Sequence, residues 1–198
     1  MINLAEMTAR DEDIIAEQIG RIPRGVIGVA WRCPCGKPGV IATAPRLPDG
    51  SPFPTFYYLT NPEAIIECSR LEASGIMAEM TARIAADDEL AAAYTAAHQA
   101  YLADRKHYGD VPEIANYSAG GMPNRVKCLH ALVGHALAAG PGVNPIGDEA
   151  LALFTPHWHD RCAHDGADLD PNAGSAAVKA EPGSEAESPS KNGAGADE

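Results

Sequence analysis

The sequence predicts an α+β fold, with a small, mostly antiparallel β-sheet of about three strands packed with four or five helices. Three observations predict it. β-Branched and aromatic residues concentrate in short runs before residue 61, helical spacing dominates after it, and glycine- and proline-rich segments separate the runs. We expect residues 1–155 to form one domain, and residues 156–198 to form a histidine-rich segment followed by a disordered acidic tail.

The first part of the chain is predicted to hold one short helix and the strands. Acidic residues in the first turn and the apolar spacing predict a helix over 11–19. Strands are predicted over 26–31 and 40–43, joined as a hairpin through the turn Cys33-Pro34-Cys35-Gly36. A third strand is expected over 55–60, where aromatic and β-branched residues follow one another.

The second part is predicted to be helical. Asn61 and Pro62 are typical of a helix start, and apolar spacing continues from there to residue 84 with a break at Gly75. A long helix is expected over 87–108. The last helix is expected to start near Pro123 and to end before the Gly-Pro-Gly run at 140–142.

Composition excludes several classes of protein. No apolar run approaches the roughly 18 residues that a membrane helix needs, so we expect no membrane insertion. The N-terminus has no signal-peptide pattern, and the five cysteines are not spaced as a disulfide framework, so we expect a cytoplasmic location. The net charge of −12, about half of it in 165–198, argues against a nucleic-acid partner and leaves a protein partner open.

Three cysteines suggest a zinc site. Cys33 and Cys35 lie two residues apart in the turn, and Cys128 precedes His130 in the last predicted helix. Thiolates and imidazoles are preferred zinc ligands, so Cys33, Cys35, Cys128 and His130 are the candidate set. On a regular helix, however, Cys128 and His130 point about 200° apart, and both could bind one ion only if Cys128 lies in an irregular first turn.

The fourth zinc ligand is the open part of this hypothesis. His130, His135, His98 and water are the candidates, although His135 lies roughly 10 Å beyond Cys128 along a regular helix. Two other interpretations remain: reduced cysteines that only pack, and a redox-active or nucleophilic thiol. Cys68 is expected to be a packing residue.

A second group of residues suggests anion binding. Two glycines before a predicted helix start leave backbone amides available to an anion, and nearby cations add positive charge. The candidates are Gly120, Gly121, Arg125, Lys127, Arg24 and Arg46. The spacing is not that of a P-loop, and a glycine-hinged loop with ordinary capping is the alternative interpretation.

Several motifs are similar to those of one protein family. They are Pro23–Val26, Arg32–Gly36, Pro45–Leu47, Pro52–Thr55, Tyr57–Thr60, Ser69–Ala73 and Ser118–Asp148. Over about residues 21–153 the chain resembles the mainly actinobacterial family catalogued as domain of unknown function 501. The resemblance implies no activity or cofactor. It implies a genomic neighbourhood with enolase, a septum-formation initiator and an exopolyphosphatase.

Three functional hypotheses follow. The first is a cytoplasmic zinc-binding domain in which Cys33 and Cys35 join the hairpin to Cys128 on the last helix. The second is an enzyme for a phosphorylated or carboxylated small molecule, with Cys128 or His130 as chemical groups. The third is a non-catalytic adaptor linked to cell division or polyphosphate metabolism, which depends on the resemblance alone.

Overall fold

The structure, a computed structural model, describes residues 2–21, 23–155 and 158. The described residues form six α-helices, one short 3₁₀-helix and a three-stranded sheet, which confirms the α+β class with more helices than expected. The predicted histidine-rich segment, apart from Trp158, and the acidic tail lie outside the described residues. The elements are α1 (Ala9–Ile19), β1 (Val26–Arg32), β2 (Pro38–Thr43), β3 (Tyr57–Leu59), α2 (Pro62–Ala73), α3 (Ile76–Ala86), α4 (Asp88–Tyr108), η1 (Pro112–Ile114), α5 (Leu129–Ala139) and α6 (Pro145–Ala152).

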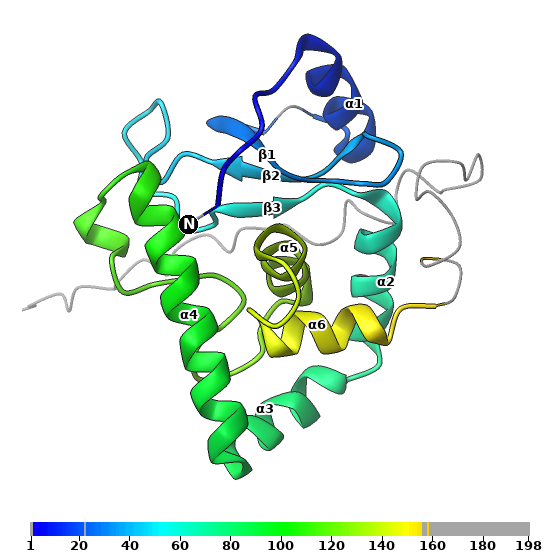
Figure 1. Cartoon of the computed structure of the whole chain (residues 1–198), viewed down its shortest axis with the longest axis vertical. Helices are drawn as coiled ribbons and strands as arrows, with labels where there is room; N and C mark the ends of the chain where they lie inside the picture. Colours follow the sequence, from blue (N-terminus) through cyan, green and yellow to red (C-terminus); the bar gives the residue numbers. More distant parts are fainter. Residues whose placement is uncertain (1, 22, 156–157, 159–198) are drawn as a thin grey trace, which may run out of the picture.

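The sheet is antiparallel in the order β1-β2-β3. β1 and β2 form the predicted hairpin, whose turn is closed by the Cys33 N–H donating to the Lys37 carbonyl at 2.9 Å. Figure 1 shows α1 on one side of the sheet and α5 on the other. All six residues of β2 are buried, because β2 is the central strand and helices cover both of its faces.

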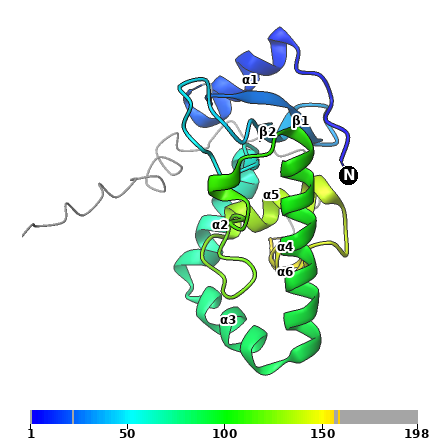
Figure 2. The same cartoon turned by 90° about the vertical axis from the view of Figure 1, so that its left-hand side faces the viewer.

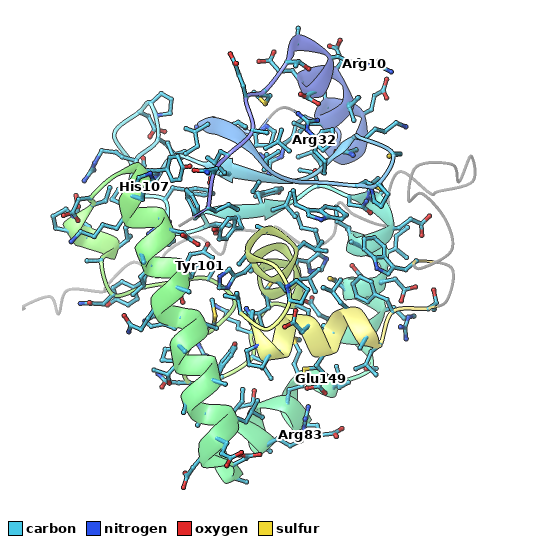
Figure 3. The ribbon with its side chains drawn as sticks, in the orientation of Figure 1. Arg10, Arg32, Arg83, Tyr101, His107 and Glu149 are labelled. Carbon is cyan, nitrogen blue, oxygen red and sulfur yellow. The ribbon has the colours of Figure 1, made fainter. Side chains whose placement is uncertain are left out.

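Helix α1 is joined to the sheet by a partly buried ion pair. Thr8 and Asp11 form a capping box at the start of the helix. The same Asp11 carboxylate, 5% exposed, accepts two hydrogen bonds from the Arg32 guanidinium, the shorter at 2.7 Å. In Figure 3, Arg32 lies between the sheet and α1. The Arg32 hydrogen bonds hold the pKa of Asp11 well below its usual range.

Replacing Asp11 by asparagine is expected to lower the free energy of unfolding by about 2 kcal/mol at pH 7. Because the folded-state pKa of Asp11 is depressed, its contribution is present above the unfolded pKa near 3.8 and is lost as the pH falls below it. Urea denaturation at pH 7 and pH 3 measures both effects. Asp13→Asn, an exposed position on the same helix, is the control, and equal losses for the two variants would contradict the prediction.

The helices pack around α5 beneath the sheet. Figure 2 shows α4 running the length of the molecule, from α3 to the sheet. Tyr101 of α4 contacts His135 of α5 edge-to-face, with 5.2 Å between ring centroids, and Tyr57 of β3 stacks on His135 at 5.4 Å. All three side chains are fully buried, so the core lies where α4, α5 and the sheet meet.

Two helix predictions require correction. Helix α5 starts at Leu129, not near Pro123. The chain before it turns at Gly120 and Gly121, which both have positive φ, and the Lys127 N–H donates back to the Gly120 carbonyl at 2.7 Å. Helix α6 was not predicted, although Asn144 and Pro145 repeat the Asn-Pro signal that starts α2. None of the helices in the described part of the chain has the length and apolar character that a membrane crossing requires.

Candidate metal centre

Three potential metal ligands meet where the end of α2 approaches the start of α5. A carboxylate oxygen of Glu72, the Sγ of Cys128 and a ring nitrogen of His130 all lie within 4.8 Å of one another. The His130 Nδ1 is 3.1 Å from Glu72 Oε1 and 3.9 Å from Cys128 Sγ. Among residues 2–21, 23–155 and 158, no other group of three or more histidine, cysteine or acidic residues has its ligand atoms this close together.

The irregular start of α5 brings Cys128 and His130 together. Cys128 is the N-cap, with φ −151° and ψ 112°, so its backbone is extended and not helical. On a regular helix the Cys128 side chain would point away from His130. Because the Cys128 backbone is extended, its side chain does not take that helical direction. This is the irregular first turn that a site with both residues requires. The later start of α5 is thus what makes the shared site possible.

Glu72 caps α5 from outside the helix. Cys128 makes no side-chain capping hydrogen bond, and the Leu129 N–H donates instead to Glu72 Oε1 at 2.6 Å. A carboxylate at this end of a helix is favoured by the helix dipole. Burial alone would raise the pKa of Glu72, but hydrogen bonds from His130 and from backbone amides outweigh burial and lower it.

His130 has a different partner on each ring nitrogen. Its Nε2 lies 3.3 Å from the Ser69 hydroxyl, one helical turn before Glu72 on α2. Burial would lower the pKa of His130, but hydrogen bonds with Cys128 and Glu72 raise it to about 9. The side chains of His130 and Glu72 are 18% and 24% exposed, so the site is partly accessible to solvent.

The two cysteines of the hairpin turn lie outside this group. Cys33 is buried at the end of β1 and Cys35 is exposed in the turn, and neither shares the grouping of ligand atoms around Cys128. Cys68 is fully buried in the hydrophobic core, as expected of a packing residue, and burial is the main cause that raises its pKa. Two candidates for the fourth ligand, His98 and His135, bond instead to Ser118 and Asn144.

The predicted anion-binding residues are divided between different environments. The glycine turn at 120–121 closes on its own backbone and precedes α5 by several residues, so its amides are not those of the helix start. Arg24 forms an ion pair with Asp49 at 3.5 Å, and Arg46 forms one with Glu113 at 2.7 Å. Arg125 and Lys127 are exposed in the segment before Cys128.

Glu72 and Ser69 are site residues that the sequence patterns do not predict. They are three residues apart on α2, a spacing that places both on one face of a helix. The three-residue spacing of Ser69 and Glu72 can be seen in the sequence. It does not indicate that either residue contacts His130, which lies 58 residues after Glu72. The packing of α2 against α5 is what joins them.

Comparison with known proteins supports the resemblance seen in the motifs. The family model described as "Protein of unknown function (DUF501)" matches residues 29–152, which is more than half of the chain. The chain belongs to this family. The matched region includes Glu72, Cys128 and His130, so the candidate centre lies within the family domain. Neither the curated proteins nor the solved structures contain a match.

Proposed function

We propose that this member of the DUF501 family binds a zinc ion through Glu72, Cys128 and His130. The supporting observation is the spacing of the ligand atoms. Zinc bonds of about 2.3 Å to sulfur and 2.0–2.1 Å to nitrogen or oxygen imply tetrahedral edges of about 3.5 Å for S···N and about 3.3 Å for N···O. The corresponding distances of 3.9 Å and 3.1 Å are close to these edges, and the Cys128 Sγ and the Glu72 oxygen lie within 4.8 Å of each other.

The surroundings of His130 also suit a metal ligand. A histidine that binds metal through one ring nitrogen usually donates its other N–H to a polar group, which fixes the ring and its tautomer. With zinc bound, His130 Nε2 would donate to the Ser69 hydroxyl, which lies 3.3 Å away, and Nδ1 would supply the lone pair for the ion. Ser69 would thus position the ligand without touching the metal.

Three protein ligands leave one tetrahedral position for water or a substrate. Structural zinc sites usually have four protein ligands, whereas catalytic sites have three and an open position. The partial exposure of His130 and Glu72 gives access to that position. We therefore favour an open zinc centre over a purely structural one. The cytoplasmic location and the adaptor role remain predictions that do not depend on this centre.

Zinc content measured after purification without a histidine tag tests the proposal. We expect about one zinc per chain for the wild type and less than about 0.1 for Cys128→Ser. Cys35→Ser is the matched control, because Cys35 is exposed and lies outside the group of ligand atoms. Equal zinc contents in Cys128→Ser and the wild type, or a wild type that neither retains nor takes up zinc, would refute it.

Zinc affinity is expected to rise with pH. At neutral pH the metal must displace a proton from His130, because the pKa of His130 is raised to about 9 in the metal-free protein. The apparent affinity should increase at least about tenfold per pH unit between pH 6 and pH 8. Competition titration with a chromogenic chelator measures this slope, and a flat profile would show that His130 is not a ligand.

The contacts of His130 favour a second candidate, a serine nucleophile. Ser69, His130 and Glu72 are ordered as nucleophile, base and orienting carboxylate, with 3.3 Å and 3.1 Å between successive groups. In this case His130 must be neutral, so activity would increase with pH towards about 9. Covalent labelling of Ser69 by a fluorophosphonate in metal-free protein would support it. Labelling that is unchanged in His130→Gln would exclude it.

A further inference from the structure

A cavity distant in sequence from the metal ligands lies at the C-terminal end of α4. Its volume is about 360 Å³, and its wall is formed by the last turns of α4 and by the segment that follows them around η1. In Figure 1 this end of α4 lies beside the sheet, and the α4–η1 connection folds back along it. Arg105 and Lys106 contribute two cations to the lining.

Arg105 is a buried cation without an acidic partner in the part of the chain that the structure describes. It is 3% exposed, and its guanidinium donates to the backbone carbonyls of Pro54, Tyr117 and Ile114. Burial lowers its pKa, because carbonyl dipoles do not replace the hydration of a full charge. A buried charge of this kind is stabilised by a counter-ion.

The geometry of these hydrogen bonds leaves one edge of the guanidinium available. Both bonds of Nη1 and one of Nη2 go to carbonyls, so the Nε–H and the second Nη2–H of Arg105 remain. Nε and Nη2 form one edge of the planar group and match the two oxygens of a carboxylate or phosphate. Among the described residues, no hydrogen-bond partner contacts this edge through Nε, and Arg105 lines the cavity.

The other polar groups of the cavity set its net charge. Lys106 forms a long ion pair with Asp110 at 3.6 Å, and both side chains are well exposed. With Arg105 included, the charged groups of the lining carry a net positive charge. The side-chain amides of Gln99 and Asn116, also in the lining, add hydrogen-bond donors for an oxyanion.

We propose that this cavity binds a small oxyanion, a phosphate- or carboxylate-bearing metabolite, through the Nε/Nη2 edge of Arg105, with Lys106 beside it. The site is separate from the zinc centre and does not depend on it. It also differs from the anion site expected from sequence, because neither the glycine turn at 120–121 nor Arg24 takes part.

Calorimetric titration with inorganic phosphate and with succinate, at constant ionic strength in chloride, tests the site. We expect saturable binding of at least one of the two, which also distinguishes a phosphate site from a carboxylate site. Arg105→Lys should weaken binding at least about tenfold, because lysine keeps the charge but loses the two-pronged edge. The same titration in Cys128→Ser shows whether binding depends on the proposed metal ligands, and we expect no change.

Two charge changes at the rim keep the test informative if Arg105→Lys fails to fold. Lys106→Gln should weaken binding about threefold to tenfold, and Asp110→Asn should strengthen it by a similar factor. Arg24→Gln, an exposed cation paired with Asp49, is the matched control and should have no effect. Absence of saturable binding at 20 mM of either anion, or an affinity unchanged in both rim variants, would overturn the proposal.

Discussion

Glu72→Gln is expected to weaken zinc binding at least about a hundredfold and to lower the pKa of His130 from about 9 towards 6.5. Glutamine keeps the size of the side chain but removes the charge that attracts both the ion and the imidazolium. Its amide oxygen can still accept from the Leu129 N–H, so α5 should remain capped, although more weakly.

The same substitution should change the pH dependence of the metal-free protein. The folded-state pKa of His130 is raised above its unfolded value of about 6.5, so its contribution to stability is full below pH 6.5 and is lost as the pH rises through about 9. We expect Glu72→Gln to lower the free energy of unfolding by about 2 kcal/mol at pH 6 and by less at pH 9. Wild-type stability should fall over this interval more steeply than that of the variant.

Glu67→Gln on the same helix is the matched control. Glu67 pairs with Arg70 and accepts from the Thr155 N–H, so its loss should affect stability without changing zinc affinity. Chelator competition gives the affinities, proton NMR of the imidazole gives the pKa of His130, and urea denaturation gives the stabilities. If both glutamine variants bind zinc as the wild type does, Glu72 is not a ligand.

Gly147→Ala is expected to lower the free energy of unfolding by about 3 kcal/mol, the largest effect we expect from a single methyl group. Gly147 lies where α6 packs against α5, and a Cβ there would be 2.4 Å from the Leu132 carbonyl oxygen and 2.7 Å from Ala136 Cβ. The carbonyl belongs to the backbone of α5, so the clash can be relieved only by moving the two helices apart. Such a shift would loosen the core around Leu132, which is fully buried.

Gly134→Ala separates this steric effect from helix propensity. Gly134 lies within α5, but a Cβ there would have no neighbour closer than 3.7 Å. Alanine is a better helix former than glycine, so this variant should be more stable by about 0.5–1 kcal/mol. Thermal and urea denaturation of both variants check the pair. A stabilised Gly147→Ala would show that α5 and α6 do not pack this closely.

The elements that the sequence predicted well are those with strong local signals. The hairpin follows from two β-branched runs separated by a short glycine-containing turn, and Asn61 with Pro62 marks the start of α2. The start of α5 was predicted too early because residues 123–128 have suitable apolar spacing. Thr81 accepts a hydrogen bond from the Val126 N–H and Gly120 accepts one from Lys127, and these contacts hold that segment out of the helix.

The sequence by itself determined the family and the α+β class, and it indicated Cys128 and His130 as candidate metal ligands. The family follows from the similarity of motifs, and the fold class from composition, spacing and local propensity, which are properties of short segments. Only the tertiary structure decided which candidate ligands lie close together. Packing of α2 against α5 brings Glu72 and Ser69 to His130, and the extended backbone at Cys128 turns its thiol towards the same point. Contacts across 58 residues depend on how the helices pack, and no local pattern in the chain specifies that packing.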